Sequence, residues 1–396
     1  MDFMDHTAVW RNEALLAAPA TQPAEVFPQF AIPGVQSLLL EGLPVAGRQT
    51  WAYAYYSLPS GEPPDGGWPA VVLFHGGGGT AYAKYVQLYN SWGYAAIIFD
   101  HYGKFPEPEK PQAERTALPG SWLSAEGLTT LPAGWLDCWN KQAGIECGKW
   151  VQHAVSLCLR AHSYLRSLPI INRDKIGMVG VSWGGVMGAI AASVDPRLCF
   201  AVLNYGCGCH NLAGPELSFH KYAAEWWVAE NFLPQCRVPL LWINGTNDQN
   251  FAPAAWSHSV ALAPSSAAAA LVPALDHSHC GFEYPWVKRY ADSFCYGATS
   301  LPKLDQSTLN ADVLSAVILR TGKGILRAEL EYTLDAGPTP RRQWQAAPAE
   351  FNRERVWASI PAGSVAYYLN VYDDTEQGGW HWPASSDYSS RDPNGY

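Results

Sequence analysis

The sequence predicts an α/β protein in which a mostly parallel, twisted sheet carries helices on both faces and a small C-terminal β-sandwich domain follows. Short apolar runs alternate with helical patterns over residues 34–297, as is typical of parallel sheets. After residue 297, alternating apolar runs succeed one another between turn signals, which favours a sandwich of about 100 residues. A chain of 396 residues also exceeds one compact core, so we expect two domains.

The predicted boundaries give an N-terminal arm at 1–33, an α/β domain at 34–297 and a β-rich domain at 298–396. The arm shows little periodicity, so we expect it to lie over the surface. Two insertions interrupt the α/β domain, at 104–147 and 209–234. The first is rich in Pro, Gly and Trp, which favours a lid or pocket wall; a solvated ornament packed on its own aromatic residues is the alternative.

Within the α/β domain, most predicted strands are continuous apolar runs, the pattern of a sheet covered on both faces. We expect strands at 37–43, 49–58, 70–74, 94–99, 176–179, 200–205, 238–244 and 267–272, and helices at 81–92 and 150–168. The second helix stops before Pro169. His153 and His162 lie within it, and we expect them to pack or cap.

The segment Gly180-Val181-Ser182-Trp183-Gly184 follows one of these strands and precedes a run of small residues. A strand, a sharp turn and a helix in this order expose a nucleophilic serine above a sheet. The turn strains the serine backbone, and the glycines two positions away on either side avoid collisions with the strand and the helix. We therefore predict that Ser182 is a nucleophile.

A glycine-rich turn, His75-Gly76-Gly77-Gly78-Gly79, follows another buried strand. Glycines let backbone N–H groups approach a developing alkoxide without interference from side chains. We predict an oxyanion hole formed by the backbone N–H group of Trp183 and by the turn at Gly76, Gly77 and Gly78.

An acid and a histidine follow two later strands. Asp248 ends a polar turn at the carboxyl end of one strand, and we predict that it orients the imidazole of the base. His277 follows the last strand and is the predicted general base. His279 is the alternative, because both rings sit on one loop. Asp276 is a weaker candidate acid, since it would have to turn back on its own neighbour.

Six segments together resemble the dienelactone hydrolase and acetyl xylan esterase-like branch of the α/β-hydrolases: PAVVLFHGGGG, WGYAAIIFDHYG, DKIGMVGVSWGGVMGAI, AVLNYGCGC, PLLWINGTND and HSHCGF. The resemblance covers about residues 34–297 and implies the α/β-hydrolase fold, with Ser182, Asp248 and His277 in the triad order of that superfamily. The dienelactone hydrolases proper use a cysteine nucleophile. The serine at position 182 therefore argues against a lactone substrate and for an ordinary ester.

The composition argues against some classes of binding partner. The net charge of -9 and the charged fraction of 15% do not predict the basic surface that binds nucleic acid or anionic membranes. No apolar run approaches the ~20 residues of a membrane span. The 18 Trp and 20 Tyr suit carbohydrate or aryl surfaces, although core packing explains most aromatic residues. We predict that Tyr205, Trp226 and Trp227 line the substrate site; a buried helix face is the alternative for the two tryptophans.

Cysteine usage predicts neither a disulfide scaffold nor a metal centre, since nine cysteines leave at least one unpaired. Cys138 and Cys147 bracket a short loop and are either bridged or reduced. Cys207 and Cys209 are spaced too tightly for a usual zinc pair. We expect no metal and no other cofactor. The first residues lack the features of a signal peptide, so we expect a cytoplasmic protein, or a secreted or periplasmic one if a signal peptide was removed.

In the β-rich domain we expect strands at 311–320, 325–334, 353–360 and 364–372, and a frayed end at 385–396. Tryptophans of this domain either bind polysaccharide or dock against the α/β domain; they are Trp344, Trp357, Trp380 and Trp382.

The predicted function is that of a metal-independent serine carboxylester hydrolase that forms an acyl-enzyme, with small acetyl-type esters of carbohydrates or similar compounds as substrates. One alternative is a prolyl oligopeptidase-like peptidase, which is disfavoured because no repeat of propeller period precedes the α/β domain. The other is a non-catalytic protein that binds a glycan or partner on the same fold.

Overall fold

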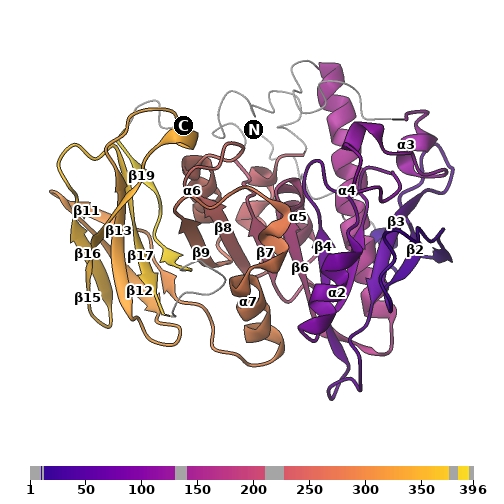
Figure 1. Cartoon of the computed structure of the whole chain (residues 1–396), viewed down its shortest axis with the longest axis horizontal. Helices are drawn as coiled ribbons and strands as arrows, with labels where there is room; N and C mark the ends of the chain where they lie inside the picture. The colour runs from indigo at the N-terminus through magenta and orange to yellow at the C-terminus, as the bar shows by residue number, and fades with distance from the viewer. Residues whose placement is uncertain (1–9, 11–12, 130–140, 210–226, 374–381, 392–396) are drawn as a thin grey trace.

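The computed structural model describes residues 10, 13–129, 141–209, 227–373 and 382–391, with backbone alone for 141–148. Figure 1 shows a central sheet flanked by helices and, on its left, a separate β-sandwich. This arrangement confirms the predicted fold class. The N-terminal half lies on the right of the view, so the chain crosses the molecule once from the first strands to the sandwich.

The central sheet has nine strands in the order β1-β2-β3-β5-β4-β6-β7-β8-β9. Pairing is antiparallel from β1 to β5 and parallel from β5 to β9. The strands are β1 (Thr21–Pro23), β2 (Gln36–Glu41), β3 (Trp51–Ser57), β4 (Trp68–Phe74), β5 (Ala95–Phe99), β6 (Ile171–Val181), β7 (Ala201–Asn204), β8 (Leu240–Gly245) and β9 (Ser266–Val272).

Helices cover both faces of this sheet, which is why its inner strands are apolar at successive positions. Along β4, Val72 and Phe74 point into one core, and Val71 and Leu73 into the other. Helices α4 (Lys141–Ser167), α5 (Trp183–Val194) and α6 (Pro253–Leu262) pack on the first face, and α2 (Ala83–Ser91) and α7 (Pro285–Cys295) on the second. Two short helices, α1 (Glu13–Leu16) and α3 (Trp122–Ala125), add buried side chains to the core on the first face.

Two predictions in the N-terminal half need correction. The helix expected at 150–168 begins at Lys141, so the end of the predicted 104–147 insertion is helical. Part of the predicted arm joins the sheet, because β1 pairs with β2. Its three residues are exposed and carry no apolar pattern, so the pairing has no local signal in the sequence.

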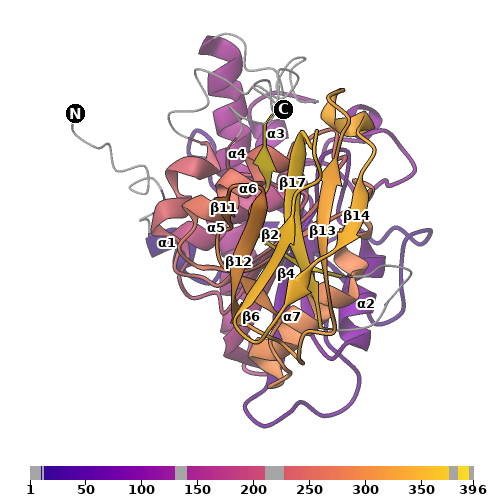
Figure 2. The same ribbon diagram turned by 90° about the vertical axis from the view of Figure 1, so that its left-hand side faces the viewer.

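The C-terminal β domain consists of two antiparallel sheets, seen face-on in Figure 2 in front of the central sheet. One sheet has β10 (Lys303–Leu304), β11 (Thr308–Asn310), β12 (Val313–Arg320), β15 (Glu350–Phe351) and β16 (Arg355–Ser359). The other has β13 (Arg327–Thr333), β14 (Gln345–Pro348), β17 (Ala366–Tyr372), β18 (Ala384–Ser385) and β19 (Ser389–Ser390). Leu314, Leu330, Val356 and Leu369 contribute to the core between them.

Strand β17 is buried at all seven positions, because the sheet that contains it lies between two packed layers. Leu369 points into the sandwich, whereas the hydroxyl of Tyr368 donates to the carbonyl of Leu271 in β9, at 3.1 Å. The predicted fraying at 385–396 is wrong for residues 385–391, where β18 and β19 pair with β17. Residues 392–396 lie outside the described residues.

Side chains of the β domain also form hydrogen bonds with backbone polar groups of β9, the edge strand of the central sheet. Ser385 accepts the N–H of Leu271 at 2.8 Å, and Arg320 and Lys303 donate to the carbonyls of Ala267 and Ser266 at 2.8 and 2.6 Å. An uncovered edge strand would expose these groups as a template for pairing with another chain. The β domain therefore completes the sheet of the α/β domain.

Candidate active site

Ser182 occupies the sharp turn between β6 and α5. Its backbone has φ +56° and ψ −120°, a left-handed conformation that a residue with a side chain rarely adopts. A Cβ atom at position 180 would overlap the carbonyl of Gly184, and one at position 184 would overlap the carbonyl of Phe74. Both glycines are therefore required by backbone approach, and the turn presents the serine hydroxyl at the carboxyl end of the sheet.

Ser182, His277 and Asp248 form one continuous hydrogen-bonded chain. His277 Nε2 lies 2.8 Å from Ser182 Oγ, and its Nδ1 lies 2.7 Å from Asp248 Oδ2. The other oxygen of Asp248 accepts the N–H groups of Asn250 and Phe251 at 2.7 and 2.8 Å. Because the carboxylate only accepts, His277 must carry its proton on Nδ1, which leaves Nε2 free to accept the serine proton.

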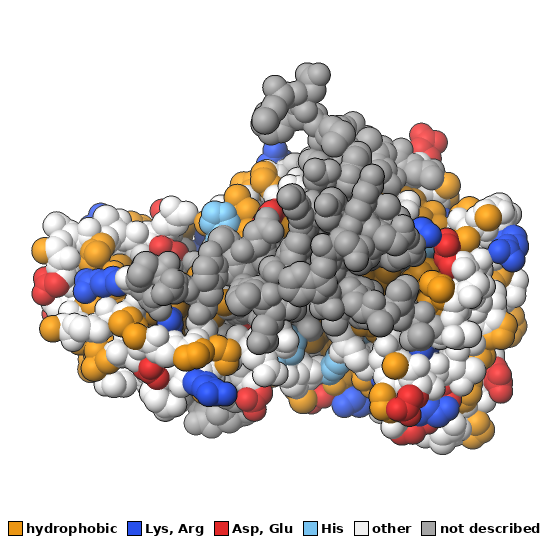
Figure 3. Space-filling model, turned by 90° about the horizontal axis from the view of Figure 1, so that it is seen from above, with side chains coloured by type: hydrophobic (Ala, Val, Ile, Leu, Met, Phe, Trp, Pro, Cys, Tyr) orange, Lys and Arg blue, Asp and Glu red, His pale blue; other side chains and the backbone are white. Residues whose placement is uncertain are grey.

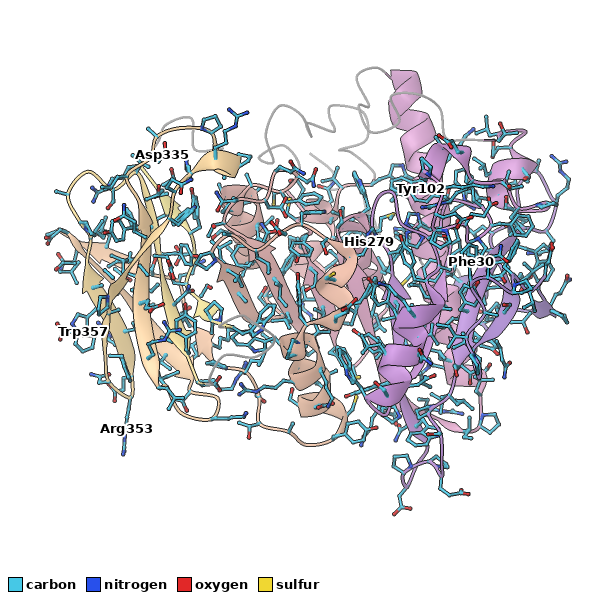
Figure 4. The ribbon with its side chains drawn as sticks, viewed as in Figure 1. Phe30, Tyr102, His279, Asp335, Arg353 and Trp357 are labelled. Carbon is cyan, nitrogen blue, oxygen red and sulfur yellow. The ribbon has the colours of Figure 1, made fainter. Side chains whose placement is uncertain are left out.

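His279 does not share this arrangement. A Cβ atom at Gly79 would lie against its Nε2, so the ring packs on the glycine-rich turn, and its other neighbour is Tyr82, with 5.5 Å between ring centroids. Burial and the nearby His277 lower the pKa of His279 to about 4. Figure 4 labels His279 near the upper end of the central strands. Of the two candidate bases, the structure places His277 in contact with Ser182.

The glycine-rich turn lies directly against the candidate nucleophile. A Cβ atom at Gly76 would stand 2.7 Å from Ser182 Cβ, and one at Gly77 would stand 2.8 Å from Cδ1 of Trp183. Backbone can thus approach the serine here where side chains cannot. The part of Gly76, Gly77, Gly78 and Trp183 in an oxyanion hole stays a prediction, and the position of the turn is compatible with it.

Arg115 holds this turn from outside and was not identified from the sequence. Its guanidinium donates to the carbonyls of Gly78, at 2.7 Å, and of Gly79, and its Nε donates to the carbonyls of Glu107 and Lys110. The side chain thereby ties the first insertion to the glycine-rich turn. An arginine within an irregular segment gives no local signal for such a contact.

A buried polar network lies behind the turn. The rings of His75 and His101 stack with centroids 3.9 Å apart, and Trp150 donates to His101 Nδ1 at 3.2 Å. Burial lowers the pKa of His101 to about 3 and that of His75 well below its usual value, so both rings are neutral. Asp100 accepts from Thr80 at 2.8 Å, and burial raises its pKa to about 6. Filled donors and acceptors make this support rigid.

Of the predicted substrate-binding residues, the structure describes Tyr205 and Trp227. Tyr205 is fully buried; its ring lies 4.9 Å from that of His277 and its hydroxyl bonds that of Tyr284. We therefore assign it to the support of the histidine rather than to a substrate surface. Trp227 packs on Trp10, with centroids 5.7 Å apart. Trp226 lies outside the described residues.

The described tryptophans of the β domain lie in two different places, near the α/β domain or on the outer sheet. Trp382 packs on Tyr284, with centroids 4.7 Å apart, and Trp344 packs on Tyr368. Trp382 therefore lies at the contact between the domains, and Trp344 packs within the β domain on the strand that faces β9. Trp357 lies on the outer sheet, far from the central sheet in Figure 4, and Trp380 is outside the described residues.

Among the described residues, no group of three or more His, Cys, Asp or Glu side chains could hold a metal ion. Cys207 and Cys209 are buried free thiols. Cys138 and the side chain of Cys147 lie outside the described parts. Within those parts, no helix is long and apolar enough to cross a membrane. Seen from above, acidic, basic and hydrophobic side chains are interspersed over the described surface (Figure 3).

The structure is similar to two solved acetyl xylan esterases. That from Paenibacillus sp. R4 matches 74% of this chain and 95% of its own, with a TM-score of 0.54 and 16% identity. Acetyl xylan esterase 1 from Thermoanaerobacterium sp. JW/SL YS485 matches 74% and 93%, with a TM-score of 0.52 and 16% identity. No protein-family model matches the chain, and no curated protein matches its sequence. The likeness shows that the chain has the α/β-hydrolase fold.

Proposed function

We propose that this protein is a serine carboxylester hydrolase that works through an acyl-enzyme. The observation that carries the proposal is the hydrogen-bonded chain from Ser182 Oγ through both nitrogens of His277 to Asp248, with steps of 2.8 and 2.7 Å. A serine hydroxyl is a poor nucleophile at neutral pH, and a base within hydrogen-bond reach activates it.

In the proposed reaction, His277 takes the proton of Ser182 as Oγ attacks the acyl carbonyl. Asp248 stabilises the imidazolium and keeps its orientation. The backbone N–H groups of Trp183 and of the turn at Gly76 to Gly78 bind the oxyanion, and each donor supplies on the order of 3 kcal/mol. His277 then protonates the leaving alcohol, and water releases the acyl group by the same steps in reverse.

For the substrate, we propose small acyl esters, acetyl-type, on carbohydrates or similar alcohols. The likeness in fold to two acetyl xylan esterases supports this choice, and so does the serine at position 182, which favours an ordinary ester over a lactone. Trp183, which follows the serine, packs on the buried rings of Trp150 and Phe251, with centroids 5.4 and 6.5 Å away, so these rings support the turn.

The test is hydrolysis of p-nitrophenyl acetate by the wild type and by Ser182→Ala, with intact-mass detection of a fluorophosphonate adduct in parallel. We expect turnover and a single adduct in the wild type, and neither in the variant. Acetylated sugars, aryl esters, uronate methyl esters and a peptide anilide would then rank the substrates. Well-folded wild type without turnover or adduct would contradict the proposal and favour a binding role.

A further inference from the structure

Asn247, in the acid loop of the candidate site, hydrogen-bonds the C-terminal β domain. Its amide nitrogen donates to the carbonyl of Arg342 at 2.8 Å and lies 3.3 and 3.4 Å from the carbonyls of Thr339 and Pro340. These acceptors are more than 90 positions away in the chain. Asn247 immediately precedes Asp248, so the β domain holds the residue next to the carboxylate.

Two further hydrogen bonds connect Asn247 to the loop that carries His277. Asn247 Oδ1 accepts the hydroxyl of Thr246 at 2.8 Å, and Thr246 Oγ1 in turn accepts the N–H of Ala274 at 3.0 Å. Ala274 begins the segment that leads to His277, and its φ is +53°. A left-handed backbone at a residue with a side chain persists only where neighbouring contacts impose it. Thr246 is fully buried and supplies one such contact.

The segment of the β domain that accepts from Asn247, residues 339–342, is itself held by several contacts. Residues Thr339–Arg341 form a short 3-10 turn, and Arg342 is buried. The guanidinium of Arg342 donates to the carbonyl of Gly337 at 2.9 Å and to the hydroxyl of Tyr388 at 3.1 Å. The N–H of Tyr388 bonds Ser257 of α6 at 2.9 Å. Asp335, near the start of this loop, lies at the upper end of the β domain in Figure 4.

We propose that Asn247 is a positioning residue, through which the C-terminal β domain holds the loops of Asp248 and His277 in the geometry that Ser182 requires. The inference rests on the proposed function for its kinetic consequence. Asn247 does not reach Ser182 or His277 in this role; it acts through the backbone on either side of the acid. A misplacement of about 1 Å far from the chemistry costs on the order of 10²-fold in rate.

The test compares variants that cut this chain with variants that do not. Asn247→Ala removes the link to the β domain, and Thr246→Val removes the link to Ala274 while keeping the side-chain shape. Thr246→Ser retains the hydroxyl as the conservative rescue. Arg289→Met is the matched control, because it breaks another contact between the domains, the ion pair with Asp373, at a residue of α7 outside both loops.

With p-nitrophenyl acetate, we expect Asn247→Ala and Thr246→Val to lower kcat about 10- to 100-fold and to change KM less than about threefold. Arg289→Met and Thr246→Ser should stay within about threefold of wild-type kcat, although Arg289→Met loses thermal stability. The proposal is overturned if Asn247→Ala keeps wild-type kcat, or if Arg289→Met matches its loss.

A second readout does not depend on turnover. The low-field proton resonance of the His277 Nδ1–H···Asp248 bond reports the geometry of that pair directly. It should broaden or disappear in Asn247→Ala and persist in Arg289→Met. If the wild type forms no fluorophosphonate adduct, the proposed function fails, and this resonance still decides the positioning role: an unchanged signal in Asn247→Ala overturns it.

Discussion

Two histidine–aspartate pairs in this molecule have nearly the same geometry and different surroundings. His277 Nδ1 lies 2.7 Å from Asp248, and His162 Nδ1 lies 2.8 Å from Asp195. The first pair sits on loops at the carboxyl ends of β8 and β9, with the His277 side chain 15% exposed. The second lies between α4 and the end of α5, with both side chains 1% exposed. Only the first has a serine at the remaining ring nitrogen.

Charge separates the pairs as well. Arg197 donates to both oxygens of Asp195 at 2.7 Å. Burial alone would raise the pKa of Asp195, but the hydrogen bonds from Arg197 and His162 outweigh it and hold the pKa below its usual value. Burial lowers the pKa of His162, which favours a neutral ring. A short imidazole–carboxylate contact therefore also occurs as buried packing, and the candidate catalytic pair is distinguished by its contact with Ser182 and by the exposure of His277.

The largest expected difference is between His277→Ala and His162→Ala. The first removes the proposed base and should lower kcat on the order of 10⁶-fold, because a serine and its base act as a unit. The second should leave kcat within about threefold and lower the melting temperature. Kinetics with p-nitrophenyl acetate and thermal unfolding check both. A comparable loss of turnover in folded His162→Ala would show that the His162–Asp195 pair is not merely structural.

The two aspartates should differ next. Asp248→Asn should reduce kcat about 10⁴-fold, because the amide favours the wrong tautomer of His277. Asp195→Asn should leave kcat nearly unchanged but cost about 3 kcal/mol of unfolding free energy, since it breaks a buried ion pair. Urea denaturation measures that cost. Stability equal to the wild type in Asp195→Asn would show that the second pair is not structural.

His279→Ala sharpens the assignment of the base. Its ring packs on Tyr82 and the glycine-rich turn, so we expect a loss in kcat of about tenfold or less, from loosening of the turn. His277→Ala is the comparison. If His279→Ala costs more than His277→Ala, the base has been misassigned.

The smallest effect concerns acid stability. The folded-state pKa of Asp195 is lowered, so its contribution is fully present above the unfolded pKa of about 3.9 and is lost as pH falls through the folded value. The difference in unfolding free energy between the wild type and Asp195→Asn should therefore be constant from about pH 7 to about pH 5 and shrink as the pH falls below about 4. Urea midpoints across this range test it. If the difference in unfolding free energy does not change with pH, Asp195 stabilises the fold through packing rather than through its charge.

The inner strands and the turn at Ser182 could be predicted from the sequence, because their causes are local. Apolar residues at successive positions mark strands covered on both faces, as in β4 and β8, and Gly180 and Gly184 mark a turn too tight for side chains. In the C-terminal domain, β12 and β13 coincide with predicted alternating runs for the same reason. The start of α4 and the short strands β1, β18 and β19 lacked such patterns.

The fold class and the three segments that carry Ser182, Asp248 and His277 thus follow from local patterns in the sequence. Tertiary structure decided which histidine touches the serine, since His277 and His279 share one loop and differ only in where the packed chain directs them. It also decided the partners of Arg115 and Asn247. Their acceptors are backbone carbonyls distant in the chain. Every residue carries such a carbonyl, so the sequence does not indicate which ones will accept these hydrogen bonds.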